Sequence, residues 1–130
     1  MKTSITLSIL GAYNALMGVS MLFFPGKMAI TMIGANRAEK NPDLEQMATM
    51  FHCGLAPALL MIGLILIMIR KCDLGTAKKS LLAYVIATAV LLTLFFTVFS
   101  KSTVMDFSFE MAVPDMLALS LALFGYFKAK

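Results

Sequence analysis

The chain has 130 residues, of which 60% are apolar and only 14% are charged, and its mean hydropathy is +0.88. Soluble domains are nearer half apolar and a quarter charged, and so small a body has too little interior to bury this many apolar side chains. The composition therefore excludes a disordered or nucleic-acid-binding protein and predicts a membrane protein. The formal charge is +4, but the basic residues are spread along the chain beside apolar runs, as topology signals are.

Four apolar segments follow one another, and each is long enough to cross a hydrocarbon core, which takes about 17–25 helical residues. They are continuously apolar and do not alternate with period two, so a membrane barrel is excluded and helices are expected. The sequence predicts an all-α bundle of four transmembrane helices that forms a single integral membrane domain over residues 1–130. The predicted spans are 5–24, 47–69, 81–99 and 111–127.

The first segment follows Lys2 and in that respect resembles a secretory signal. It runs about 20 residues, however, against about 7–15 for a signal core, and it ends in Phe23-Phe24-Pro25-Gly26 without a small-x-small cleavage site. We expect it to be a retained span.

Lysine and arginine counts predict the orientation of an even-numbered bundle. One face carries both termini and the 70–80 loop, with Lys2, Arg70, Lys71, Lys78, Lys79, Lys128 and Lys130. The other face carries Lys27, Arg37, Lys40 and Lys101. The richer face is expected to be cytoplasmic, or stromal or matrix in an organelle.

The connection 25–46 is the only long one, and its first part, 27–34, is expected to form a short helix along the outer membrane interface. It ends in a helix-start signal, because Asn41 can cap, Pro42 suits the first helical position, and Asp43 favours the positive end of the helix dipole. The second long helix is therefore expected to begin near Pro42.

The fourth segment contains the most informative anomaly. If Asp115 stayed among the headgroups, the dozen residues after it would cover about 18 Å of a core about 30 Å thick. That leaves three options: Asp115 lies inside the hydrocarbon boundary, the bilayer is thinned, or the fourth helix does not fully cross. We expect the first, with Glu110 close to the interface. Ionisable groups inside a membrane are candidate functional sites. The alternative is a structural acid that bonds backbone amides beside Pro114 at the start of the helix.

His52 lies at a similar depth in the second span, which also enters from the outer face. His52 and Asp115 would meet if the second and fourth spans pack together, and the pair would then suit a proton or metal relay. The proton- or cation-binding candidates are therefore His52, Glu110 and Asp115. The alternative for His52 is a structural residue that only forms hydrogen bonds. Pro57 and Pro114 add backbone carbonyls that lose their helical partner in the same half of the bundle.

Other chemistry has little support. The chain has 12 methionines, and those near His52 and Cys53 would suit copper(I), but methionine also fills irregular helix contacts. Cys53 and Cys72 fall on opposite sides of the membrane and neither belongs to a CxxC motif. Nucleophile elbows, phosphate loops and HExxH motifs are absent from the sequence, so an enzyme is the least favoured class. The sequence identifies no cofactor and no metal.

Small residues indicate how the helices associate. Gly11 and Gly18 share a face of the first span with Asn14 adjacent, and Gly54-x-x-x-Ala58 repeats the small-xxx-small spacing in the second span. We expect close helix contact at these positions. Asn14 lies at mid-depth and is expected to bond to another helix.

The stretch from Leu10 to Gly18 that ends in Phe24-Pro25, followed by Phe51-His52-Cys53-Gly54-Leu55-Ala56 and the run to Arg70-Lys71, resembles the first hairpin of DoxX-like small four-helix membrane proteins. The resemblance covers about half of the chain and rests mostly on glycine spacing. It implies a four-helix bundle more than an activity.

Two classes of function remain open. The first is a non-catalytic accessory or structural subunit of a larger integral membrane complex, whose partners would be the lipid bilayer and other membrane subunits or further copies of the chain, with a pigment or metal as further options. The second is a small proton- or cation-coupled transporter that uses His52, Glu110 and Asp115.

Overall fold

The computed structural model describes residues 2–106 and 108–128, and within them no strand occurs. The elements are α1 (Lys2–Phe23), α2 (Pro25–Ile33), α3 (Ala35–Lys40), α4 (Pro42–Ile69), α5 (Leu74–Thr97), the short 3₁₀ helix η1 (Phe99–Lys101) and α6 (Phe109–Phe127). Four of them, α1, α4, α5 and α6, are long and apolar enough to cross a membrane. The predicted all-α architecture with four spans is confirmed.

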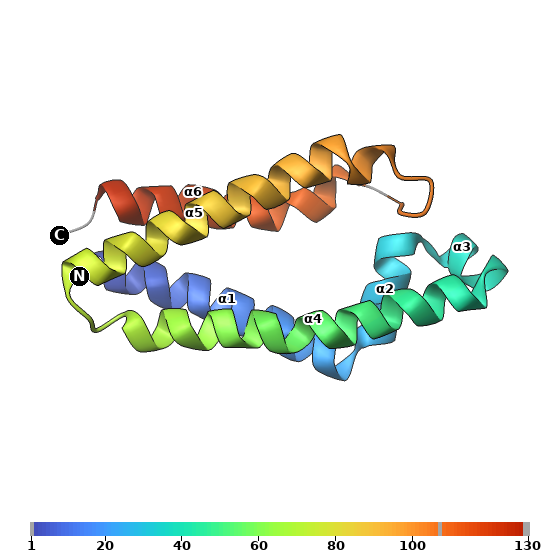
Figure 1. The fold of residues 1–130 in the computed structure, drawn as a ribbon, viewed down its shortest axis with the longest axis horizontal. Coiled ribbons are helices and arrows are strands. Elements are labelled where there is room, and N and C mark those ends of the chain that lie inside the picture. The colour runs from blue at the N-terminus through green and yellow to red at the C-terminus, as the bar shows by residue number, and fades with distance from the viewer. Residues whose placement is uncertain (1, 107, 129–130) are drawn as a thin grey trace.

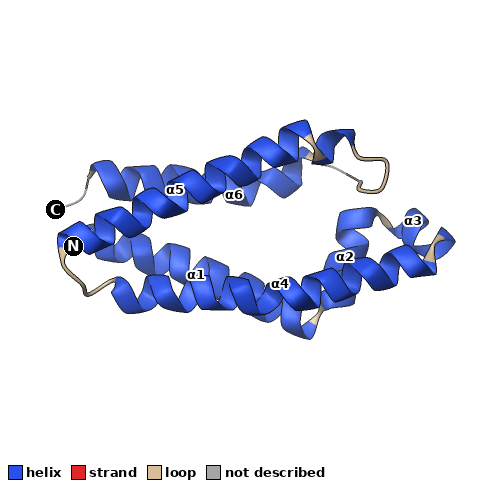
Figure 2. Cartoon of the chain, viewed as in Figure 1, coloured by secondary structure: helices blue, strands red, loops and turns tan. Residues whose placement is uncertain are grey.

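The four long helices are arranged as two antiparallel pairs, α1 with α4 and α5 with α6 (Figure 1). The pairs lie close together at the end that holds both termini and the α4–α5 turn, which we name the proximal end. They diverge toward the distal end, where α2, α3 and the α5–α6 connection lie. Loops make up little of the described chain (Figure 2). The second pair packs mainly on α1, because α4 makes few contacts with α5 and none with α6 among the described residues.

The main core lies where all four long helices meet. Leu7 and Leu10 of α1 and Leu81 of α5 are fully or almost fully buried there, with Leu66 of α4 beside them. Small residues of α6, Ala118 and Ala122, complete this core. Small side chains on α6 let its backbone approach α1 closely, as helix contacts in membranes require.

Glycines allow the closest contact, which joins α1 to α4. A Cβ atom on Gly18 would lie 2.6 Å from the backbone nitrogen of Leu60, and one on Gly11 would lie 2.8 Å from the backbone oxygen of Gly63. A Cβ atom on Gly63 would in turn overlap the backbone nitrogen of Ala15. The two backbones therefore touch where Gly11 and Gly18 were expected to mediate packing.

Gly54 and Ala58 differ from their expected role. Gly54 is exposed, and a Cβ atom added to it would meet nothing within 4 Å, while Ala58 is only half-buried. The small residues that α4 turns toward α1 are Ala56 and Gly63, both buried. The spacing Gly54-x-x-x-Ala58 lies on a different side of the helix, because positions two residues apart are separated by about 200° around a helix.

Helix boundaries follow local capping signals in part. α4 begins at Pro42 as predicted, but Asn41 contributes its backbone oxygen rather than a side-chain cap. α5 begins at Leu74, seven residues before the predicted span. Asp73 caps it by accepting a hydrogen bond of 2.8 Å from the backbone nitrogen of Thr76. The expected 70–80 loop is therefore a four-residue turn.

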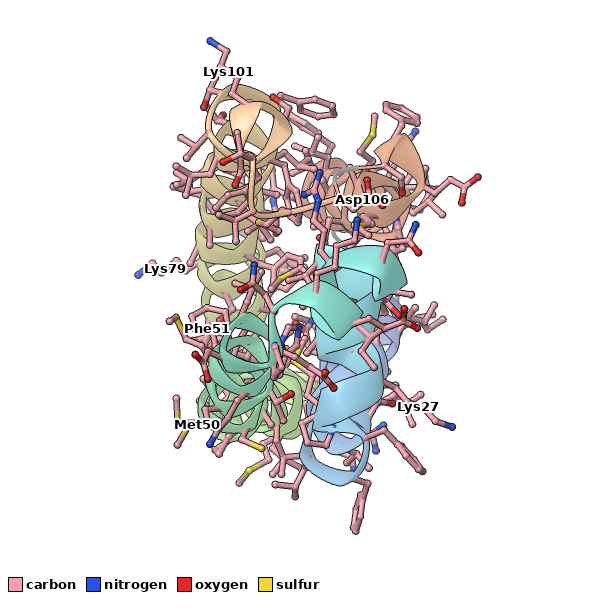
Figure 3. All side chains as sticks on the ribbon, turned by 90° about the vertical axis from the view of Figure 1, so that its right-hand side faces the viewer. Lys27, Met50, Phe51, Lys79, Lys101 and Asp106 are labelled. Atoms are coloured by element: carbon pink, nitrogen blue, oxygen red, sulfur yellow. The ribbon has the colours of Figure 1, made fainter. Side chains whose placement is uncertain are left out.

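A second, smaller core closes the distal end. Ala29 and Ile33 of α2, Ala38 of α3 and Ala48 of α4 are buried together. The expected helix in the 25–46 connection is thus present, and its apolar side packs on α4. The α5–α6 connection reaches this cap through Asp106, seen in Figure 3, whose backbone nitrogen donates a hydrogen bond of 3.0 Å to the oxygen of Met32.

Candidate functional site

A layer of polar side chains crosses the bundle between the main core and the distal cap. It is built from Tyr13 and Asn14 of α1, Tyr84 of α5 and Asp115 of α6. These four residues are named the polar layer below. Each lies in a helix that is otherwise apolar enough to span a membrane, so their placement needs a physical reason.

Asp115 lies on the side of α6 that faces the other helices. The helical period places it on one stripe with Ala112, Ala118 and Ala122, all of which are buried. Asp115 itself is half-buried. It is the seventh residue of α6, which puts it about 9 Å along the axis from the start of that helix.

The Asp115 carboxylate has one described hydrogen-bond partner. The hydroxyl of Tyr13 donates to its Oδ1 atom across 3.2 Å and so links α6 to α1. No lysine, arginine or histidine in the described part of the chain forms an ion pair with this carboxylate. Asp115 therefore lies in a membrane-spanning helix without a cationic partner among the described residues.

Asn14 holds the second link of the layer. Its Nδ2 atom donates to the hydroxyl of Tyr84 at 3.0 Å and to the backbone oxygen of Leu10 at 2.8 Å. The prediction that Asn14 bonds to another helix is confirmed, with α5 as the partner. Because Tyr13 and Asn14 are adjacent in α1, their two hydrogen bonds bring the Asp115 carboxylate of α6 and the Tyr84 hydroxyl of α5 to the same level of the bundle.

His52 lies apart from this layer. It is buried on α4, where its Nδ1 atom lies 2.8 Å from the backbone oxygen of Ala48 and its ring meets that of Phe51 edge-on. A carbonyl only accepts, so Nδ1 carries the hydrogen. A His52–Asp115 pair requires contact between the second and fourth spans. Among the described residues α4 packs on α1 and α2 and does not touch α6, so the pair does not form.

Glu110 is also separate from Asp115. It is exposed in the first turn of α6, where a negative charge suits the positive end of the helix dipole. Pro114 falls inside α6 rather than in its first turn, and it leaves the backbone oxygen of Glu110 without the usual amide donor. Pro57 has the same effect on Cys53 in α4.

Neither cysteine forms a disulfide in the described part of the chain. Cys53 and Cys72 are free and exposed, in the distal half of α4 and in the proximal turn respectively. No group of three or more histidine, cysteine, aspartate or glutamate residues among residues 2–106 and 108–128 could hold a metal ion. The polar layer thus has one carboxylate, two phenol hydroxyls and one amide as its chemical groups.

Comparison with protein-family models, with curated proteins and with solved structures found no match. The resemblance to DoxX-like proteins stays a prediction.

Tyr13 and Tyr84 are the residues of the layer that the sequence did not single out. A usable signal was present in each case. Tyr13 directly precedes Asn14, and Tyr84 shares a helix face with Leu81 and Thr88, which are three and four residues away and buried. A phenol on the inward face of an apolar helix needs a hydrogen-bond partner, and that requirement points to the layer.

Proposed function

We propose that this protein is a non-catalytic accessory or structural subunit of a larger integral membrane complex. The observation that carries the proposal is an apolar groove of about 400 Å³ on α5. Among the described residues it is lined by α5 alone, through Val85, Ile86, Ala89, Val90, Thr93 and Leu94. Within the described chain α4 touches α5 too little to cover this face.

The chemistry of the groove favours a transmembrane helix of a partner subunit over a polar ligand. Thr93 is the only lining residue with a polar side chain, and its hydroxyl already donates to the backbone oxygen of Ala89 at 2.8 Å. A polar ligand would find no charged group there. A helix would find an apolar surface with Ala89 at its centre, and small residues are where membrane helices approach most closely.

Purification in a mild detergent tests the proposal. We expect the wild-type chain to isolate with other membrane subunits in a fixed stoichiometry. Ala89→Trp fills the groove and should release those subunits, while Leu117→Trp, at a position on α6 that is 66% exposed, is the matched control and should retain them. A pure, lone chain, or equal retention in both variants, would count against an accessory role.

A second candidate is a small proton- or cation-coupled transporter, and the observation that favours it is the Tyr13–Asp115 hydrogen bond inside a span. Support for a relay through His52, Glu110 and Asp115 is weaker, because the three side chains do not come together. Reconstitution into liposomes tests this candidate. Asp115→Asn should abolish proton or cation flux, and undiminished flux would remove the hypothesis.

A further inference from the structure

We infer that the polar layer is a binding site for one small cation, a proton or an alkali-metal ion, held by Asp115 beside the hydroxyl of Tyr13. The inference does not depend on an accessory role. It narrows the ligand-binding part of the transporter candidate to one carboxylate and leaves out His52 and Glu110.

The first step is the missing positive charge. An ionised carboxylate inside a membrane-spanning helix is costly, and such groups face the interior of the bundle or a water-filled cavity and pair with other groups there. Asp115 has only the Tyr13 hydroxyl as a described partner, and no described basic residue forms an ion pair with it. One unit of positive charge from outside the chain would complete the site.

The second step concerns the groups that face Asp115 from each helix packed against α6. Tyr13 of α1 donates to Asp115 and Tyr84 of α5 is joined to the adjacent Asn14, while α4 does not contact α6 among the described residues. Neither tyrosine is cationic. Both hydroxyls have oxygen lone pairs as well as a hydrogen, so they suit a protonated carboxyl or a metal ion at the carboxylate.

Hydrogen bonds within the polar layer already hold its side chains in place before any ion binds. Asn14 donates to the Tyr84 hydroxyl and also to the backbone oxygen of Leu10, which fixes the amide. Because the Tyr84 oxygen accepts from Asn14, the hydroxyl hydrogen of Tyr84 can donate to a neighbouring group. The second carboxylate oxygen of Asp115, Oδ2, has no described hydrogen-bond partner, and it is not fully buried. This oxygen is where the cation would be bound.

The chain carries its own optical probe for this binding. It has three tyrosines and no tryptophan, and two of the tyrosines belong to the polar layer. The third, Tyr126, packs its ring against Phe127 at the other end of α6. In a Tyr126→Phe background, tyrosine absorption and fluorescence report on Tyr13 and Tyr84 alone.

The experiment uses this background protein in lipid vesicles and has two arms. One arm adds sodium or potassium at fixed pH with an organic cation keeping the ionic strength constant. The other varies pH without alkali metal, below pH 8 and therefore well under the phenol pKa of about 10. A saturable response is expected in at least one arm, and the arm that responds identifies the ion.

Variants decide whether Asp115 holds the ion. Asp115→Asn should abolish the response, whereas Asp106→Asn, at an exposed carboxylate near the distal end, should leave it unchanged. Tyr13→Phe keeps the carboxylate and should shift the midpoint by about threefold, as expected for one lost hydrogen bond in a membrane. This variant keeps the test decisive if Asp115→Asn fails to fold.

The inference is overturned if neither arm gives a saturable response, if Asp115→Asn responds like the parent protein, or if the Tyr13→Phe midpoint does not move. Cation binding with no flux in liposomes would support the site and remove the transporter. The two ideas therefore fail on different measurements.

Discussion

Single polar residues determine which helices of this bundle are joined. Asn14 reaches α5 through Tyr84, and Tyr13 reaches α6 through Asp115. Membrane helices gain little from apolar burial against each other, because lipid is equally apolar, so such hydrogen bonds add specificity to van der Waals packing. The adjacent residues Tyr13 and Asn14 thus link α1 to both helices of the second pair.

A double-mutant cycle on Asn14 and Tyr84 measures the first of these links. Asn14→Leu and Tyr84→Phe each remove one partner of the 3.0 Å hydrogen bond. We expect a coupling free energy of about 0.6 kcal/mol, the average for hydrogen bonds between membrane helices. Unfolding in mixed micelles provides the measurement. Strictly additive effects of the two changes would contradict a direct interaction.

The sequence could predict which residues were unusual but not which ones would meet. Asn14, His52 and Asp115 are recognisable as polar groups in apolar spans from the sequence alone. Their partners depend on which helices are neighbours, and four spans of similar hydropathy contain little information on that order. His52 and Asp115 were expected at a similar depth, yet among the described residues α4 and α6 belong to different pairs and do not touch.

At the scale of the element, α1 and α4 come into contact on the face of α4 that carries Gly63. Gly54 and Gly63 are both in α4, but only Gly63 lies against α1. The small-xxx-small spacing identified Gly54 because the sequence shows spacing and not direction. A nine-residue separation corresponds to about 180° around the helix, so the two glycines face opposite ways.

Substitution of the two glycines provides a matched comparison. Gly63→Leu introduces a side chain where even a Cβ atom would overlap the Ala15 backbone, and we expect a loss of about 1–3 kcal/mol in the free energy of unfolding, as for other overpacked sites. Gly54→Leu points into open space and should cost far less. Equal losses in the two variants, measured by unfolding in mixed micelles, would contradict the α1–α4 contact.

The N-terminus of α5 provides a prediction about pH. The pKa of Asp73 is lowered, chiefly because its side chain accepts hydrogen bonds from the Thr76 hydroxyl at 2.7 Å and from the Thr76 backbone nitrogen. A lowered folded-state pKa means that this cap stabilises the folded state fully above the unfolded pKa of about 3.9 and loses that contribution as pH falls through the folded value.

We therefore expect Asp73→Ala to lower the stability of α5 at neutral pH and to have a smaller effect at acidic pH, as the carboxyl becomes protonated in both states. The helical circular-dichroism signal during unfolding measures this difference. Asp73→Asn is the control, because an amide still accepts a hydrogen bond but does not titrate in this range. An Asp73→Ala effect that is independent of pH would show that the charge is not involved.

At the scale of the whole molecule, one small contact closes the distal end where the helix pairs diverge. Asp106 bonds to Met32, and its carboxylate lies over Gly34, where a Cβ atom would be 3.0 Å from Oδ2. Gly34 has a φ of 86°, the only positive φ among the described residues. Glycine is therefore required there both for backbone conformation and for space.

Gly34→Ala should loosen the distal end and leave the main core intact. We expect faster hydrogen exchange at the amide of Asp106, with unchanged exchange around Leu81. A residue other than glycine in such a sparsely populated backbone region costs about 1–3 kcal/mol of stability. Gly26→Ala is the control, since nothing lies within 4 Å of its added Cβ atom. Unchanged exchange at Asp106 in Gly34→Ala would contradict this closing role.

The orientation of the molecule in its membrane follows from the same two ends. Both termini and Cys72 belong to the proximal end, while Glu39 of α3 is exposed at the distal end (Figure 1). The richer supply of lysine and arginine near the proximal end predicts that this end faces the cytoplasm or its equivalent. A membrane-impermeant thiol reagent should therefore label Cys72 in inverted vesicles and not in intact cells.

A second cysteine makes the topology test complete. Glu39→Cys in a Cys72→Ser and Cys53→Ser background should show the opposite pattern, because helix α4 carries the chain across the membrane between the two positions. Labelling of both positions from one side would mean that α4 does not cross. Reversal of both patterns would keep the four spans and place the polar layer, with Asp115, nearer the cytoplasmic surface than the lysine and arginine distribution predicts.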